Sequence, residues 1–195
     1  MGEDHAEIKQ ALRRRLRAAR VELPPRVAAE LGEAVCARVL GLPAFVAARA
    51  LVAYCPVENE VDPGALVAAA LAAGKAVYYP RRTAGDLEFL ESGPADLAPG
   101  SCAILEPRDG MPLSSASGEG VVFLVPGIAF DPRGVRLGRG AGYYDRGLAR
   151  HPHAARVGLA YEMQVVPTLP EATWDVRMDA VVTEARVLAV KERSP

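Results

Sequence analysis

The sequence predicts an α/β fold, a three-layer α/β/α single domain with a mostly parallel sheet over residues 1–195. Residues 50–54 (ALVAY) and 121–125 (VVFLV) are apolar throughout, which is typical of parallel strands covered on both faces. A helical pattern separates the first run from a third strand-like run at 76–79, which is the spacing of a β-α-β unit. Two helices followed by alternating strands and helices then favour three layers.

Two helices are expected before the first strand. Along residues 3–20, apolar side chains recur at steps of three and four, in the order Ile8, Leu12, Leu16 and Ala19. This periodicity predicts one buried stripe on a helix whose other faces carry arginines. Pro24 and Pro25 suit the first turn of a second helix that ends near Leu40.

The remaining elements are predicted from apolar runs and from the glycine and proline residues that end them. We expect a helix over 63–73 ended by Gly74, a strand over 76–79 stopped by Pro80, a helix over 143–150, and strands over 155–160 and 180–183. Residues 81–120 are rich in Gly, Pro, Ser and Asp, and only 86–91 and 102–105 are expected to be extended. A long irregular stretch in a compact domain usually lines a site.

Composition excludes several classes of protein. The 195 residues carry a formal net charge of −1, which argues against binding of nucleic acid or an anionic membrane through the overall field. Cys36, Cys55 and Cys102 are odd in number and far apart, so they form no disulfide framework or metal motif. The N-terminus lacks the apolar region of a signal peptide, and no apolar stretch could span a membrane. A cytoplasmic protein is therefore expected.

The chemistry is expected in residues 125–148, which follow the most strand-like run and open a helix. Gly138, Gly140 and Gly142 would let backbone N–H groups approach a phosphate, although a plain turn is the alternative. Nearby side chains add cations, a hard oxygen ligand for Mg²⁺ and ring faces: Arg136, Arg139, Asp145, Tyr143 and Tyr144. Alternatively, both tyrosines serve packing, and Asp145 stabilises its own helix or pairs with Arg146 at the surface.

The same segment carries a resemblance to a known family. Residues 126–148, with PGIAFD and RLGRGAGYYDR, resemble the signature of the 5-formyltetrahydrofolate cyclo-ligases, also called methenyltetrahydrofolate synthetases. Five other stretches are similar in order and spacing: Lys9 with Arg13, Glu60 with Val61, LEP at 105–107, and the segments 157–164 and 175–184. The resemblance covers nearly the whole chain.

The resemblance implies a fold shared with ribose-phosphate isomerases and CoA transferases. It also implies an ATP- and Mg²⁺-dependent conversion of 5-formyltetrahydrofolate to 5,10-methenyltetrahydrofolate, with phosphorylation of the formyl oxygen before ring closure. The expected partners are therefore small molecules, with no nucleic acid and no membrane. Two other functions stay open: a non-catalytic nucleotide- or folate-binding protein of the same fold, and an enzyme similar to a sugar-phosphate isomerase.

Site residues carry over from the family motifs. The resemblance implies that ATP is bound by Lys9, Arg13, Arg136, Gly138, Arg139, Gly140, Gly142, Tyr143 and Tyr144, with Arg136, Arg139 and Tyr143 catalytic; that Cys55 and Glu60 bind the folate; and that Asp145 and Asp175 bind Mg²⁺. Three positions depart from the family pattern: Ala141 replaces a glycine, Trp174 stands where many members carry His, and Cys102 stands where an aromatic residue is common.

Without the resemblance, several of these residues have simpler interpretations. Glu60 would be an exposed loop acid and Cys55 a buried small hydrophobe. The arginines that follow Lys9, at positions 13, 14, 15, 17 and 20, would form a solvated helix face, and this is what we expect for Arg14 and Arg15. A nucleic-acid-binding helix is disfavoured because no aromatic residues that could stack on bases surround it.

Overall fold

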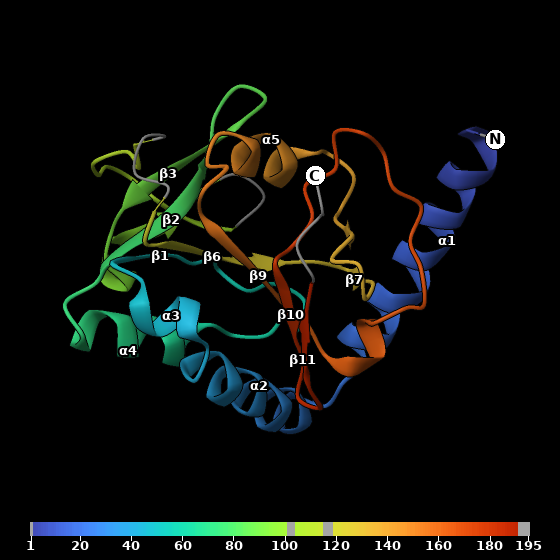
Figure 1. Ribbon diagram of the computed structural model, residues 1–195, viewed down its shortest axis with the longest axis horizontal. Coiled ribbons are helices and arrows are strands. Elements are labelled where there is room, and N and C mark those ends of the chain that lie inside the picture. The colour runs from blue at the N-terminus through green and yellow to red at the C-terminus, as the bar shows by residue number, and fades with distance from the viewer. Residues whose placement is uncertain (1, 101–103, 115–118, 191–195) are drawn as a thin grey trace.

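In the computed structural model, which describes residues 2–100, 104–114 and 119–190, seven strands form one central sheet (Figure 1). They are β1 (Ala50–Val52), β2 (Ala76–Arg82), β3 (Leu87–Glu91), β6 (Val121–Pro126), β9 (Ala155–Leu159), β10 (Ala180–Val182) and β11 (Val187–Ala189). Their order is β11-β10-β9-β6-β1-β2-β3. The five inner strands pair in parallel, and β3 and β11 pair antiparallel at the two edges. The predicted mostly parallel sheet is confirmed.

Helices cover both faces of this sheet. The described helices are α1 (Gly2–Val21), α2 (Pro25–Leu40), α3 (Pro43–Ala47), α4 (Gly64–Ala72) and α5 (Tyr143–Ala149). Figure 1 shows α2, α3 and α4 below the sheet and α5 above it. None of the helices in the described part of the chain combines the length and apolar character that a membrane span requires.

The core divides into two layers because side chains alternate along each strand. Leu51 of β1 packs into a buried cluster with Val35 of α2 and Leu66 of α4. The next residue, Val52, belongs to a cluster on the opposite face with Leu148 of α5. The three-layer α/β/α arrangement predicted from the sequence is therefore confirmed.

Smaller elements lie outside the central sheet. They are two hairpins, β4 (Leu97–Pro99) with β5 (Leu105–Pro107) and β7 (Ala129–Phe130) with β8 (Arg136–Leu137), and the 3₁₀ turns η1 (Pro94–Asp96) and η4 (Glu162–Gln164). A third buried cluster joins α1 to the β7–β8 hairpin, with Leu16 packed among Ile128, Val135 and Leu137. The helix α1 is thereby fixed beside the loop that follows β8.

Two strand boundaries differ from the prediction. In the expected extended stretch 102–105, residues 102 and 103 lie outside the described residues, and β5 begins only at Leu105 and continues to Pro107. Pro80 does not stop β2, which continues to Arg82 and pairs with β3. Backbone groups of Ala76 and Tyr78 bond toward β1, so by alternation the nitrogen of Pro80 points to the same side. Because β1 ends at Val52, no strand there requires an N–H donor from Pro80.

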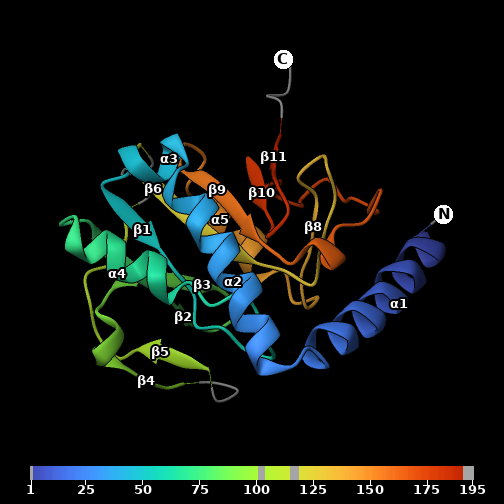
Figure 2. The ribbon, with the colours of Figure 1, turned by 90° about the horizontal axis from the view of Figure 1, so that it is seen from below.

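The apolar stripe of the first helix is also shorter than predicted. Leu16 is buried, but Ile8 is 40% exposed. The N-terminal half of α1 extends away from the sheet (Figure 2), so its apolar residues meet no core. In the same helix Arg20, which belongs to the arginine run, is 1% exposed.

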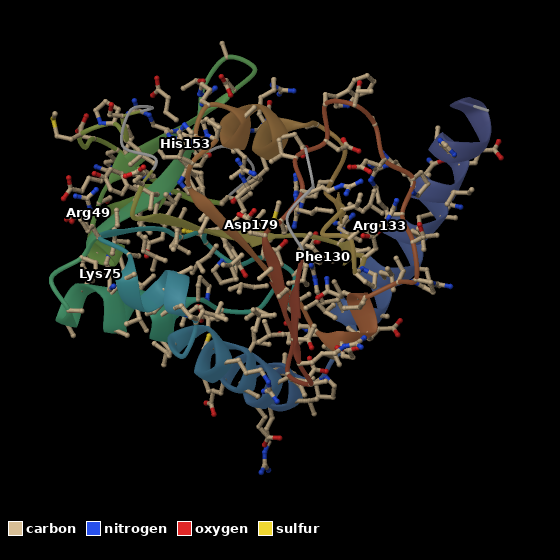
Figure 3. All side chains as sticks on the ribbon, viewed as in Figure 1. Arg49, Lys75, Phe130, Arg133, His153 and Asp179 are labelled. Carbon is tan, nitrogen blue, oxygen red and sulfur yellow. The ribbon has the colours of Figure 1, made fainter. Side chains whose placement is uncertain are left out.

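We expect Gly158→Ala to destabilise the fold by about 1–3 kcal/mol, the usual cost of overpacking a core. A Cβ at Gly158 in β9 would lie 2.6 Å from Cε1 of Phe130, which is fully buried and labelled in Figure 3. Gly41→Ala is the control, because its Cβ would meet only the Arg38 carbonyl oxygen at 3.6 Å. Urea denaturation measures both free energies of unfolding, and equal values would show that Phe130 moves aside freely.

Candidate active site

A cavity of about 420 Å³ opens at the carboxyl ends of β1 and β6. Tyr54 and Cys55, which follow β1, line one side, and Pro126 and Gly127 at the end of β6 line another. The connection after β1 runs through α4 on one face of the sheet, and the connection after its neighbour β6 runs through α5 on the other face. Such a switch point is where open α/β sheets bind ligands.

The cavity collects every site residue proposed from the sequence. Lys9, Arg13, Cys55, Glu60, Arg136, Gly138, Arg139, Gly140, Gly142, Tyr143, Tyr144, Asp145 and Asp175 all line it. The stretch 81–120 contributes Arg82, Leu87, Ile104 and Glu106, as its irregular composition predicted. Cys102 lies outside the described residues. Residues from distant parts of the chain thus line one cavity.

The glycine-rich loop between β8 and α5 has a conformation that only glycine adopts easily. Gly140 has φ +110° and Gly142 has φ +67°, both in the left-handed region. The loop is tied to α1, because Nε of Arg13 donates to the Gly138 carbonyl oxygen at 2.9 Å. One side of the cavity is therefore a backbone turn held by a cationic side chain.

Asp145 is held by Arg136, nine residues earlier in the chain. Nη2 of Arg136 donates to its Oδ1 at 3.1 Å and its Oδ2 at 3.0 Å, and the Val176 N–H donates to Oδ1 at 3.3 Å. Arg146 instead donates to the Gly85 carbonyl oxygen and lies over the ring of Tyr143. The alternative of a surface pair between Asp145 and Arg146 is therefore wrong.

Asp175 is held in a comparable way. Nζ of Lys9 lies 3.3 Å from its Oδ2, and the Ala172 N–H donates to the same oxygen at 2.8 Å. Both aspartates keep some access to the cavity, with 17% of the Asp145 side chain and 15% of the Asp175 side chain exposed. Each carboxylate is thus fixed in place and remains accessible from the cavity.

The donor set fits Mg²⁺ that is shared with a bound phosphate. In the part of the chain that the structure describes, no cluster of three or more His, Cys, Asp or Glu side chains could hold a metal ion by itself. Mg²⁺ commonly takes one or two carboxylates and completes its shell with phosphate oxygens and water. Asp145 and Asp175, which line the same cavity as the glycine-rich loop, match that requirement.

Glu60 lies deep in the cavity rather than on an exposed loop. Its side chain is 8% exposed, Oε2 accepts the Val57 N–H at 3.2 Å, and Oε1 lies 3.4 Å from Nη2 of Arg20. Burial raises the pKa of the Glu60 carboxyl, and the charge of Arg20 opposes that rise. The interpretation of Glu60 as an ordinary loop acid is wrong.

The neighbouring cysteine is unsuited to nucleophilic chemistry. Burial raises the pKa of the Cys55 thiol to about 11, so the side chain is protonated at neutral pH. In this state Cys55 offers the cavity a small, weakly polar surface.

The two tyrosines combine packing with lining of the cavity. The hydroxyl of Tyr143 accepts a hydrogen bond from Nη2 of Arg82 at 2.9 Å, and the Arg82 guanidinium also lies 4.7 Å from the ring centroid. Arg136 lies 5.4 Å from the ring centroid of Tyr144. Burial, with a contribution from Glu60, raises the pKa of Tyr144, which keeps its hydroxyl neutral.

Sequence reasoning missed some cavity residues. Arg82 was missed because the strand was predicted to end at Pro80. Its place just after a predicted strand is the signal that could have identified it. Trp174 was noted only as a departure from the family pattern, but it lines the cavity and is 75% exposed. Arg20 does not line the cavity but donates to the Gly127 carbonyl oxygen in its wall, and no local signal in the sequence distinguishes it from the other arginines of α1.

Comparison with known proteins gives concordant matches. A sequence model of the 5-formyltetrahydrofolate cyclo-ligase family matches residues 5–184. The 5-formyltetrahydrofolate cyclo-ligase of Escherichia coli K12 is 35% identical over 182 residues, covering 88% of this chain and 98% of the relative.

Two solved structures have similar folds. The 5,10-methenyltetrahydrofolate synthetase of Aquifex aeolicus superposes with a TM-score of 0.84 at 34% identity, covering 96% of this chain and 95% of that one. A 5,10-methenyltetrahydrofolate synthetase from Mycoplasma pneumoniae superposes with a TM-score of 0.73 at 22% identity, covering 90% of this chain and 98% of that one. The second likeness concerns the fold alone.

Proposed function

Because the chain belongs to the 5-formyltetrahydrofolate cyclo-ligase family, we propose that it converts 5-formyltetrahydrofolate and ATP to 5,10-methenyltetrahydrofolate, ADP and phosphate with Mg²⁺. The observation that carries this proposal is the single cavity at the β1–β6 switch point. There, cations, a glycine-rich loop and two carboxylates line the same cavity as a buried glutamate. These groups suit a triphosphate and a ring with N–H donors.

The proposed chemistry needs no covalent intermediate on the protein. The formyl oxygen attacks the γ-phosphorus, and the bond between that phosphorus and ADP breaks. The neighbouring folate nitrogen then attacks the formyl carbon and loses its proton, and phosphate leaves with the former formyl oxygen. Such a reaction depends on positioning and on stabilisation of charge, which fixed cations and backbone N–H groups supply.

The phosphate end of the cavity is assigned to α1 and the glycine-rich loop. Lys9 and Arg13 reach it from one face of α1, and Gly138, Gly140 and Gly142 provide backbone that can approach closely. Arg139 pairs with Glu58 at 3.2 Å, but 47% of its side chain is exposed. An exposed pair of this kind contributes little to stability, so Arg139 is free to exchange it for a phosphate.

Arg136 and Tyr143 complete the catalytic set. Arg136 is nearly buried and grips Asp145 with both contacts described above, so it fixes that carboxylate and adds positive charge where phosphoryl transfer occurs. Tyr143 and Tyr144 present ring and hydroxyl surface beside it. When bound, Mg²⁺ neutralises phosphate charge, and Asp145 and Asp175 are the residues that hold it.

The folate end is assigned to Glu60 and Cys55. Two charge-assisted hydrogen bonds from pterin N–H donors would suit a carboxylate that is buried yet reaches the cavity. Cys55 would line the ring with its uncharged thiol. The cytoplasm is the proposed location, since Cys36 and Cys55 are free thiols.

Glu60→Gln should raise the KM for 5-formyltetrahydrofolate about tenfold, because the neutral amide keeps the size but loses the charge-assisted bonds to the pterin. The KM for ATP should not change. Glu30→Gln is the matched control, since Glu30 pairs with exposed Arg26 on α2 and does not line the cavity. Steady-state kinetics with each substrate varied in turn measure the effect, and an unchanged folate KM would return Glu60 to a structural role.

Folate-dependent release of ADP tests the proposed function against its alternatives. The enzyme should release ADP only when 5-formyltetrahydrofolate, ATP and Mg²⁺ are all present. A non-catalytic binding protein would bind ATP or folate but release no ADP. A sugar-phosphate isomerase of similar fold would turn over its substrate without ATP. Either result would overturn the proposal.

A further inference from the structure

Arg20 is a buried cation that none of the assigned roles uses. Its side chain is 1% exposed, at the last turn of α1. Nη1 donates to the Gly127 carbonyl oxygen at 2.9 Å, Nε donates to the Glu58 carbonyl oxygen at 3.0 Å, and Nη2 lies 3.4 Å from Oε1 of Glu60. One guanidinium therefore joins α1 to the loop after β1 and to the end of β6, the two strands that flank the switch point.

Such a group is costly to bury unless each of its donors is satisfied. Two of the three acceptors are backbone carbonyl oxygens that fix where the guanidinium lies. The third is the carboxylate of Glu60, which is itself nearly buried. A planar fork held at two of its nitrogens presents the third, Nη2, in a fixed direction, and Lys could not reproduce this geometry.

We propose that Arg20 is the positioning residue for folate binding, and that it acts by holding the carboxylate of Glu60 ionised and aimed into the cavity. This inference rests on the proposed function, because it assigns Glu60 to the folate. Arg20 does not line the cavity, so it acts through Glu60 and not by touching the substrate.

The charges around Glu60 single out Arg20. Arg20 faces it from α1, Arg139 from the glycine-rich loop, Glu58 from its own loop, Tyr54 from the end of β1 and Tyr144 from α5. Arg139 is about half exposed, with its nearest nitrogen 3.7 Å from Oε1, and it is assigned to the phosphates. Arg20 is the buried cation of the set. Its removal should therefore raise the pKa of Glu60 further, adding to the rise caused by burial.

The test measures the dissociation constant of 5-formyltetrahydrofolate by titration calorimetry from pH 6 to pH 9, a window of about three units around neutrality. Calorimetry needs no turnover, so a loss of catalysis and a wrong role for Arg20 give different results. In Arg20→Met we expect binding at least about tenfold weaker at neutral pH, because part of the Glu60 population becomes protonated. That loss should shrink as the pH rises and ionises Glu60. ATP binding should not change.

Arg17→Met is the matched control. Arg17 lies one turn earlier on α1, is exposed and pairs with the side chain of Glu58 rather than with Glu60. Its folate affinity and the pH dependence of that affinity should equal those of the wild type. The same result in Arg20→Met would overturn the proposal.

A double-mutant cycle separates positioning from general structural support. If Arg20 acts through Glu60, adding Arg20→Met to Glu60→Gln should weaken folate binding by less than about threefold. Equal losses in both backgrounds would overturn the proposal, because they would show an effect independent of Glu60. If Arg20→Met does not fold by circular dichroism, Arg20→Lys replaces it in the same cycle, with the same required lack of additivity.

Discussion

Asp145→Asn should reduce turnover by at least about a hundredfold in a chain that remains folded, the loss typical of removing a group that stabilises charge in the transition state. Asparagine keeps the size of the side chain and an oxygen that can accept from Arg136, so the contact at 3.0 Å has a substitute. What is lost is the anionic ligand for Mg²⁺. Excess Mg²⁺ should therefore recover part of the rate.

The measurement is a Mg²⁺ titration of initial rate for the wild type and the variant, with folding checked by circular dichroism. Asp86→Asn is the control, because Asp86 is also paired with an arginine, Arg150, but lies outside the cavity. It should keep the wild-type response to Mg²⁺. A folded Asp145→Asn enzyme with the wild-type rate at limiting Mg²⁺ would remove Asp145 from the metal site.

Arg13→Ala should weaken apparent ATP affinity by about 10- to 150-fold, since a hydrogen bond to a charged group contributes about 1.5–3 kcal/mol. Two effects combine at this position. The variant loses a cation beside the phosphates, and it also loses the bond from Nε to the Gly138 carbonyl oxygen that holds the glycine-rich loop. Folate affinity should stay nearly unchanged, because Glu60 does not contact Arg13.

Arg14→Ala is the matched control, one residue further along α1 and exposed to solvent. Its ATP affinity should remain within about twofold of the wild type, as for most exposed charges. Titration of the intrinsic fluorescence of Trp174, the single tryptophan of the chain, reports ATP binding from within the cavity. Equal losses in both variants would show that the wrong face of α1 was assigned to the phosphates.

Much of the fold was predictable because its strongest signals are local. The apolar run at 121–125 is fully buried within β6, and the β-α-β spacing from 50 to 79 correctly predicts β1 and β2 side by side. Short elements gave no such signal. The helix α3 (Pro43–Ala47) has five residues and β11 (Val187–Ala189) has three, which is too few for a period to show.

The errors that remained depend on long-range contacts. Pro80 fits inside β2 only because β1 ends before reaching it, and Ile8 is exposed only because α1 extends beyond the sheet. Neither fact is encoded within a local window of sequence. Predictions from local sequence therefore failed at the positions where no neighbouring strand or core packs against the residue.

The motifs predicted which residues line the cavity, but they did not predict which charged side chains pair with one another. Adjacent sequence suggested a pair between Asp145 and Arg146, whereas the fold places Arg136 against both carboxylate oxygens. In sequence, Arg20 is indistinguishable from its neighbours in an arginine-rich helix. Only the structure shows that it contacts the loop that carries Glu58 and Glu60. Pairing of charges across elements depends on tertiary packing, so it needed the structure.

The central claim is that this cavity closes the folate ring at the expense of ATP. The most direct measurement follows the absorbance of 5,10-methenyltetrahydrofolate as purified protein is mixed with 5-formyltetrahydrofolate, ATP and Mg²⁺. We expect product to accumulate with an equal amount of ADP, and we expect no product when ATP or Mg²⁺ is omitted. Absence of product under conditions in which another cyclo-ligase of the family forms it would contradict the account.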